Sequence, residues 1–260
     1  MTVSFIIATY NGEKYLTKTV ESALEQKDVD VEIVIIDDGS SDKSFILAQD
    51  LMKNDSRIKS MKNDSNLGFS RTVNKALQFV SGEFLIILDQ DDILYPDHCK
   101  NALPYFDENS VAMVFNNYFL IDGNGTIFDR SIHCLERNLT MSDFIKANRI
   151  PVPGLMIRTN ILIKAGGYPS LPNYPNYAEY HTWIRIAELG EIVFCKENVA
   201  LYRRHETNMT NTFEDKKTLK KLYGYYFVCK KQMLSSKKLN VVQKCKLVMS
   251  MTHDYIKSLI

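Results

Sequence analysis

The first ninety residues alternate between short apolar runs and segments with helical spacing. Four runs of strand length, rich in β-branched residues, lie at 3–8, 31–36, 57–61 and 84–88. Between them, apolar residues recur at intervals of three and four, which predicts amphipathic helices. Because near-continuous apolar strands suit burial on both sides, this order predicts a parallel sheet with helices on both faces.

The pattern beyond residue 110 is less regular. We expect a strand at 111–115, a turn at 122–125, a helix at 180–189, short strands at 192–195 and 199–202, and a helical tail from about 213 to the end. A chain of 260 residues fits one large α/β domain with a short appendage. The predicted domains are therefore 1–212 and a helical extension over 213–260.

Composition and charge narrow the class of protein. A hydrophobic fraction of 45% with 24% charged residues is typical of a folded protein, and a net charge of +1 gives no global attraction to nucleic acid. The five cysteines are scattered without a CxxC pair, which favours free thiols in a reducing compartment. No run approaches the roughly 18 apolar residues of a spanning helix, so we expect a cytoplasmic protein, with contact at the membrane surface left open.

Polar residues gather where the predicted strands end. They are Thr9-Tyr10-Asn11-Gly12, Asp37-Asp38-Gly39-Ser40-Ser41-Asp42 and Asp89-Gln90-Asp91-Asp92. Ligands of parallel sheets bind at this edge. None of the loops has the glycine pattern of a dinucleotide site or a P-loop, so the sequence does not support either of these two kinds of nucleotide-binding site.

Three carboxylates within four residues, Asp89, Asp91 and Asp92, repel one another unless a cation or donor groups offset them. Mg2+ or Mn2+ binds one or two carboxylates together with substrate phosphates, and this matches the motif. A helix N-cap at Asp92 or Asp97 is the alternative, but a cap needs only one acid and the motif has three.

The second loop, at 37–42, allows two interpretations. Asp38 could accept the imide N–H of uracil, or Asp42 could start the next helix.

Five ordered motifs carry a resemblance to a known family. They are Ser4-Phe5-Ile6-Ile7-Ala8-Thr9-Tyr10-Asn11, Ile36-Asp37-Asp38-Gly39-Ser40-Ser41-Asp42, Asn66-Leu67-Gly68 with Arg71 and Asn74, Gly82-Glu83-Phe84 leading to Leu88-Asp89-Gln90-Asp91-Asp92, and Tyr202-Arg203-Arg204-His205. Over about residues 2 to 210 the chain resembles glycosyltransferase family 2, the inverting enzymes of GT-A fold. The resemblance implies a Rossmann-like, mainly parallel sheet flanked by helices, with a donor half at 1–110 and an acceptor half at 111–212.

The resemblance also implies roles in binding a nucleotide-sugar donor, most simply a UDP-sugar. Donor contacts would come from Thr9, Tyr10, Asn11, Asp38, Arg71, Asp89 and Asp92, with Asp38 at uracil, Arg71 at the ribose or diphosphate and Asp92 near the sugar. Asp91 and His205 would bind Mn2+ or Mg2+. Either Arg203 or Arg204 could meet the diphosphate.

The catalytic base departs from the family pattern. An inverting transfer needs a base for the acceptor hydroxyl, and the family usually places an Asp there, after another acid. In Ala178-Glu179-Tyr180-His181-Thr182-Trp183, Glu179 stands at that position and Ala178 replaces the other acid. Glu179 is therefore the predicted base; the alternative is that it is an ordinary first-turn residue of a helix.

The departure from the family pattern keeps open a second function, a catalytically impaired module that binds a nucleotide sugar. A third function, a nucleotidyltransferase, is disfavoured because no glycine-rich phosphate loop follows the first strand.

The acceptor is expected to be a carbohydrate or a lipid-linked glycan of a surface polysaccharide. Segment 166–175 is a candidate acceptor loop, and the aromatic residues Tyr168, Tyr174, Tyr177, Tyr180 and Trp183 could stack on sugars or form core. From Lys216 to Lys257 the tail has eleven lysines against one acid, Asp254, with Leu219, Leu222, Tyr223, Tyr226 and Phe227 between them. Such a tail could lie on an anionic membrane or pack on the catalytic domain.

Overall fold

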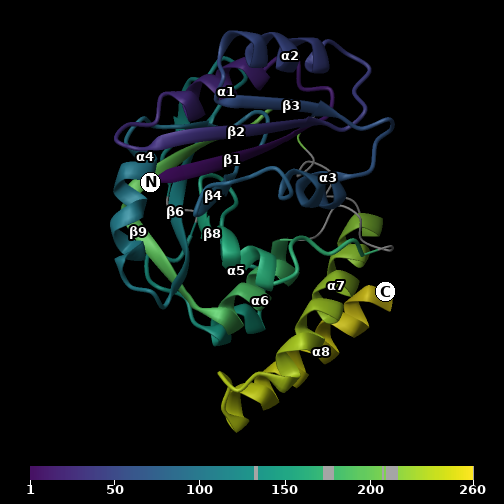
Figure 1. Ribbon diagram of the computed structural model, residues 1–260. Helices are drawn as coiled ribbons and strands as arrows, with labels where there is room; N and C mark the ends of the chain where they lie inside the picture. Colours follow the sequence, from purple (N-terminus) through teal and green to yellow (C-terminus); the bar gives the residue numbers. More distant parts are fainter. Residues whose placement is uncertain (132–133, 172–178, 207, 209–215, 260) are drawn as a thin grey trace.

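The computed structural model describes residues 1–131, 134–171, 179–206, 208 and 216–259. Within these ranges a nine-stranded mixed sheet forms the centre of the molecule, in the order β3-β2-β1-β4-β8-β6-β9-β5, with β7 paired to β6 (Figure 1). The strands are β1 (Thr2–Thr9), β2 (Asp30–Asp37), β3 (Ile58–Lys62), β4 (Phe84–Ile87), β5 (Ile93–Leu94), β6 (Val111–Ile121), β7 (Ile127–Asp129), β8 (Met156–Arg158) and β9 (Glu191–Arg203).

Helices pack on both faces of this sheet. They are α1 (Leu16–Leu24), α2 (Ser44–Asn54), α3 (Phe69–Ala76), α4 (His98–Ala102), α5 (Thr159–Lys164), α6 (Glu179–Leu189), α7 (Lys216–Lys231) and α8 (Val241–Leu259), with 3-10 turns η1 (Leu103–Asp107), η2 (Met141–Ile145) and η4 (Gln232–Ser235).

The first four strands pair in parallel, as the sequence predicts. Alternate residues of β1 enter different cores: Phe5 and Ile7 belong to the cluster that contains residues of α1 and α4, and Ile6 belongs to the cluster that contains residues of α3 and α6. All three side chains are 0% exposed. Both faces of the parallel half are therefore buried, which explains its near-continuous apolar strands.

The second half of the sheet is less regular because β8 runs antiparallel between β4 and β6. The two short strands expected at 192–195 and 199–202 form one strand, β9, so this expectation was wrong. Phe115 of β6 pairs with Phe194 and Asn117 pairs with Val199, which leaves residues 195–198 of β9 opposite one residue of β6. This bulge accommodates the polar residues that divide the apolar pattern.

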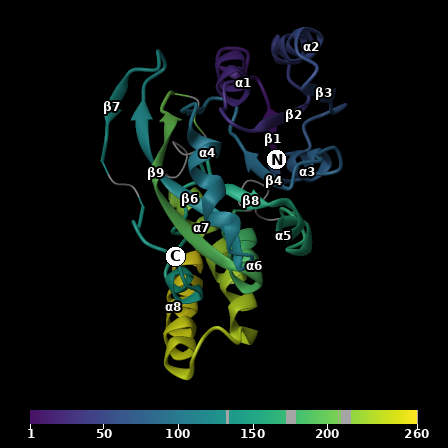
Figure 2. The same ribbon diagram turned by 60° about the vertical axis from the view of Figure 1, so that its left-hand side comes forward.

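The tail forms two antiparallel helices, α7 and α8, which lie side by side and extend away from the sheet (Figures 1 and 2). Their buried residues Tyr225, Cys229, Leu247 and Met251 join the same core as α6 and η2. The apolar side chains Leu222, Tyr226 and Phe227 also pack against this core. The predicted boundary at 212–213 lies outside the described residues. Along the described chain, helices with both the length and the apolar character to cross a bilayer are absent.

Candidate active site

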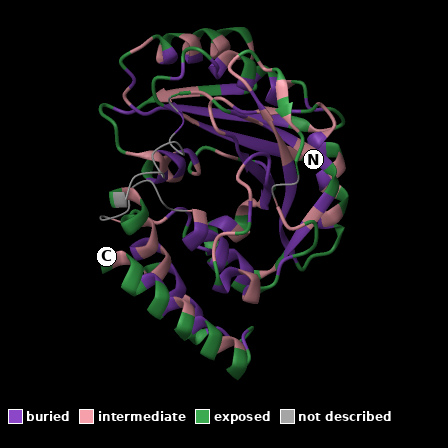
Figure 3. Ribbon diagram, turned by 180° about the vertical axis from the view of Figure 1, so that it is seen from behind, coloured by how far each residue is buried: buried purple, intermediate pink, exposed green. Residues whose placement is uncertain are grey.

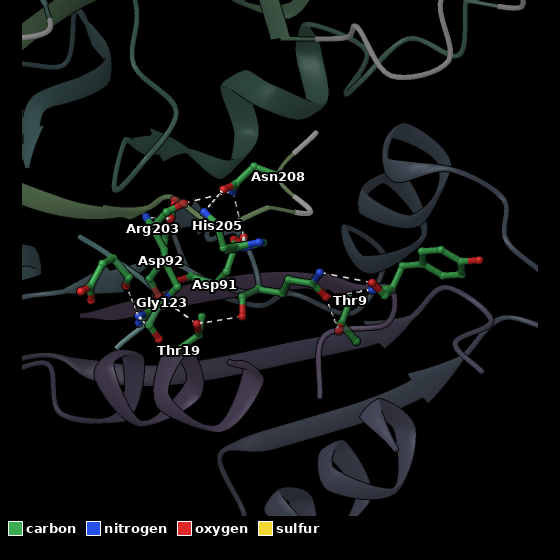
Figure 4. A network of polar contacts seen from close by, with 11 residues as sticks. Thr9, Thr19, Asp91, Asp92, Gly123, Arg203, His205 and Asn208 are labelled. Carbon is green, nitrogen blue, oxygen red and sulfur yellow. Dashed lines mark hydrogen bonds and ion pairs between the residues drawn. The ribbon is translucent and has the colours of Figure 1, made fainter. Parts of the chain in front are cut away.

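The loop after β4 carries the acid cluster, and Arg203 at the end of β9 fixes its backbone (Figure 4). The Arg203 side chain is 1% exposed. Its Nε donates to the carbonyl oxygen of Asp91 at 2.8 Å, and its backbone N–H donates to Oδ1 of Asp92 at 3.0 Å. Of the two arginines in Tyr202-Arg203-Arg204-His205, Arg203 therefore holds the loop in place through hydrogen bonds, whereas Arg204 is exposed.

Asp91 and His205 lie together although 114 residues separate them in sequence. The distance between Asp91 Oδ2 and His205 Nε2 is 2.7 Å, and both side chains remain partly accessible, at 14% and 15%. Asn208 completes the group: its Oδ1 accepts the backbone N–H of His205 at 2.5 Å and its Nδ2 lies 3.4 Å from Asp91 Oδ2. The sequence argument missed Asn208, although it stands three residues beyond the histidine.

The chemistry of this pair fits a hard divalent cation that substrate oxygens help to bind. Among the described residues, no three His, Cys, Asp or Glu side chains form a group that could hold a metal ion by themselves. A carboxylate and an imidazole nevertheless suffice where a diphosphate and water supply the remaining ligands. The structure brings the predicted residues Asp91 and His205 together, and their binding of an ion stays a prediction.

Glu179 and Asp89 interact through their charges across the same site. Glu179 is the first residue of α6, and Asp89 follows β4. Burial, together with the nearby carboxylates of Asp91 and Glu179, raises the pKa of Asp89 to about 8. The structure therefore brings the candidate base to the acid cluster, which its distance along the chain does not reveal.

The prediction puts Asp92 near the donor sugar, whereas the structure buries its side chain. Its side chain is 0% exposed, and burial together with the charges of Asp91 and Asp89 raises its pKa well above the ordinary value. The carboxyl group accepts the backbone N–H of Arg203. Asp97 precedes α4 without a side-chain cap bond, and Asp92 is engaged with Arg203, so the helix-cap alternative explains neither residue. In this structure Asp92 is therefore a buried member of the loop that contacts Arg203, and its contact with a donor sugar stays a prediction.

Gln90 links this loop to the end of β1. Its Oε1 accepts the Thr9 hydroxyl at 2.6 Å and the backbone N–H of Tyr10 at 2.9 Å, and its Nε2 donates to the Tyr10 carbonyl at 3.2 Å. We call these contacts the Gln90 clamp. A Cβ on Gly12 would lie 2.1 Å from Gln90 Oε1, which explains the glycine. Thr9 is 0% exposed and acts within the clamp, whereas Tyr10 is 47% exposed at the sheet edge. The sequence argument assigned no role to Gln90.

Asp38 organises the neighbouring loop. Its carboxylate accepts the backbone N–H groups of Leu67 and Gly68, each at 2.9 Å, and the side-chain amide of Asn63 at 2.8 Å. A carboxylate offers about four acceptor positions, and Asp38 is 4% exposed with three of them used, so a bond from an imide N–H stays a prediction. Asn11 has a φ of 50°, and its Oδ1 accepts the backbone N–H of Ser41 at 2.9 Å. This bond connects the loop after β1 to the loop after β2.

The candidate acceptor loop is described only over 166–171, and Tyr174 and Tyr177 lie outside the described residues. Asn74 of α3 binds the backbone of Tyr168 near the start of this loop. Its Nδ2 donates to the Tyr168 carbonyl at 2.6 Å, and its Oδ1 accepts the Tyr168 N–H at 2.9 Å. Arg71 of the same helix lies nearby, with its Nε 3.2 Å from the hydroxyl of Ser170.

Of the aromatic residues considered for acceptor stacking, the three that the structure describes are buried. Tyr168, Tyr180 and Trp183 have at most 1% exposure and belong to the core. They support α6 from within, so this described set offers no open ring to a sugar.

This arrangement of sheet, strand-end loops and acid cluster is typical of α/β enzymes, which bind ligands at the carboxyl edge of parallel strands. Residues 4–165 match the family model "Glycosyl transferase family 2". The chain belongs to this family and is a glycosyltransferase.

Similar proteins agree with this assignment. The chain is 32% identical over 202 residues to TuaG of Bacillus subtilis, a glycosyltransferase assigned to teichuronic acid biosynthesis; the match covers 77% of this chain and 78% of TuaG. It is 30% identical over 125 residues to WfgD of Escherichia coli, named as a glucosyltransferase from UDP-Glc to GlcNAc-diphosphoundecaprenol; this match covers 48% of this chain and 49% of WfgD.

A solved structure shows the same fold. TarS of S. aureus, in complex with UDP-GlcNAc, superposes with a TM-score of 0.77 at 19% identity, over 98% of this chain and 73% of that one. The expected GT-A fold is thus confirmed. A second neighbour is the mannosyltransferase PcManGT of Pyrobaculum calidifontis with GDP-Man and Mn2+, with a TM-score of 0.65 at 14% identity, over 99% of this chain and 86% of that one.

Proposed function

We propose that this glycosyltransferase moves a sugar from a UDP-linked donor to a carbohydrate or lipid-linked glycan, with inversion at the anomeric carbon and with Mn2+ or Mg2+ as its cofactor. One observation carries the proposal. Asp91, after β4, and His205, after β9, place a carboxylate and an imidazole 2.7 Å apart beyond the strand ends, and the charge of Glu179, at the start of α6, reaches Asp89 of the same acid cluster. An enzyme that must bind a diphosphate and deprotonate an alcohol needs both functions there.

The donor side rests on the strand-end loops. Asp38 has an acceptor position left for the uracil imide, Tyr10 is exposed beside it, and the Gln90 clamp holds Tyr10 to the acid loop. Arg71, which is exposed on α3, would contact the ribose or diphosphate. The UDP and UDP-GlcNAc complexes of TarS support this donor class.

The metal would be held by Asp91 and His205, with Asn208 positioning both. When bound, the cation stabilises the charge that develops on the leaving diphosphate. The raised pKa of Asp89 means that this carboxyl group would lose its proton more readily beside a bound cation.

Glu179 would act on the acceptor side. Its carboxylate accepts the proton of the acceptor hydroxyl while the hydroxyl oxygen attacks the anomeric carbon from the face opposite the diphosphate. The C1–O bond to the diphosphate breaks as the new C1–O bond forms. WfgD, whose named acceptor is GlcNAc-diphosphoundecaprenol, supports a lipid-linked glycan as the acceptor class.

Calorimetric titration of UDP, GDP and dTDP, with and without Mn2+, tests the donor and metal parts. We expect UDP to bind tightest, to require the ion, and to lose binding in Asp91→Asn. Asp97→Asn, an exposed acid six residues further on, is the matched control and should bind like the wild type. Absence of nucleotide binding under every condition would leave the family fold without this activity. Donor binding without turnover on any acceptor would instead identify a binding module.

A further inference from the structure

The outward face of α8 carries a stripe of exposed apolar side chains, interrupted by Thr252, in which Tyr255 also contacts the ring of Phe227 on α7. Its members, with their exposed fractions, are Val241 (78%), Val242 (64%), Val248 (51%), Met249 (64%), Tyr255 (50%), Ile256 (49%) and Leu259 (60%). At about 100° per residue these seven positions fall within an arc of about 140°, and the stripe runs along about 28 Å of helix. Figure 3 shows the exposed side of α8 facing away from the body.

The opposite face of α8 already accounts for its packing. Leu247 and Met251 are buried in the core shared with α6 and η2. The Ser250 hydroxyl donates to the Ile145 carbonyl at 2.9 Å, and Asp254 pairs with Lys230 at 2.5 Å. The helix is thus fixed to the protein on one side, and its stripe is a second, separate apolar surface.

Lysines border this stripe on both edges. On the helical projection, Lys244 lies beside one edge, and Lys246 and Lys257 lie beside the other. The only acid between Lys216 and Lys257 is Asp254, and it is 3% exposed and paired with Lys230, whose side chain is 0% exposed. The accessible surface around the stripe therefore carries positive charge without an acid of its own to offset it.

This charge pattern favours one of two partners for the stripe, an anionic bilayer, over the other, a second copy of α8. Two copies of α8 face to face would bring lysine edges together without acids to pair with them, which is unfavourable. An anionic bilayer accepts the apolar side chains at the depth of the headgroups and attracts the lysines on both sides. We propose that α8 docks this glycosyltransferase on an anionic membrane surface, with the stripe turned into the lipid interface.

The surface differs from the one that the sequence suggested. The tail residues singled out there as apolar partners of the lysines lie on α7, and Leu222, Tyr226 and Phe227 pack against the core. The docking face is on the other helix of the pair. Because membrane contact is measured without turnover, the proposal stands apart from the proposed donor, metal and base.

Co-sedimentation of the full chain with vesicles of phosphatidylcholine, with and without phosphatidylglycerol, is the test. We expect binding that needs phosphatidylglycerol. Met249→Glu with Ile256→Glu should weaken it more than tenfold, whereas Ile46→Glu with Ile163→Glu, which places the same charges at 58% exposed isoleucines of α2 and α5, should not. Because all four positions are exposed, both variants should unfold at the wild-type temperature and bind UDP like the wild type.

A second variant keeps the test independent of the apolar change. Replacing Lys244, Lys246 and Lys257 by Gln should weaken binding to anionic vesicles about fivefold per lysine, since each contributes about 1 kcal/mol near such a surface. Unchanged vesicle binding in the Met249/Ile256 variant would overturn the proposal. So would a wild-type dimer in light scattering that this variant converts to monomer while neither protein binds vesicles, because a second copy would then occupy the stripe.

Discussion

Glu179→Gln separates catalysis from donor binding. The amide retains the size of the side chain but cannot take a proton from the acceptor hydroxyl. Loss of a positioned general base slows a reaction by about 10²- to 10⁴-fold. We therefore expect kcat to fall by at least about a hundredfold, with the fold unchanged because the site of Glu179, at the first turn of α6, is only partly buried.

The structure also predicts the direction of the effect on donor binding. Glu179 is one of the charges that raise the pKa of Asp89 to about 8. Removing this charge lowers that pKa, so more Asp89 is ionised at pH 7 and the cation site becomes more negative. With a pKa of about 8, only about one Asp89 in ten is ionised at pH 7, which limits the gain in affinity for UDP with Mn2+ to about tenfold.

The assay combines sugar transfer from UDP-sugars with calorimetry of UDP and Mn2+ at pH 7. Glu188→Gln, an exposed acid near the other end of the same helix, is the matched control and should leave both readings unchanged. Two results would refute the reasoning: near-normal turnover in Glu179→Gln, which removes its role as base, or a marked loss of UDP affinity, which makes it a donor ligand.

Three further predictions concern the loops and the tail. Gln90→Ala, which removes the Gln90 clamp, should weaken UDP binding about tenfold in the same titration. Because Asp89 binds a proton up to a pKa of about 8, Mn2+ affinity should rise as the pH increases toward 8 and level off above it; a flat profile in the wild type would contradict this role. Asp254→Asn leaves the charge of Lys230 buried and should lower the free energy of unfolding by about 3 kcal/mol in urea denaturation, whereas Asp50→Asn, at an exposed ion pair, should not change it measurably.

The parallel half of the fold could be read from the chain because its signals are local. Strands β1 to β4 are apolar runs closed by polar loops, and burial on both faces makes that pattern nearly continuous. β9 was divided in the prediction because Lys196 and Glu197 interrupt its apolar residues. The interruption is a bulge against β6, and pairing with a distant strand cannot be seen in a short window.

For the site, the acid cluster and the resemblance to the family predicted Asp91, His205 and Glu179 as members, and the fold brings these residues to one region of the molecule. Which side chains face a ligand was decided by packing. Asp91 and Asp92 are neighbours in the sequence, yet one is accessible and the other lies buried under Arg203.

The sequence by itself determined the family, the order of the first strands and the residue types of the site, because these depend on local patterns and ordered motifs. Tertiary structure decided the roles of Gln90 and Arg203 and the face of the tail that is left exposed. These depend on contacts between segments far apart in the chain. In α7 and α8 both helices are amphipathic, and only their packing on the core shows that α8 has a second apolar face.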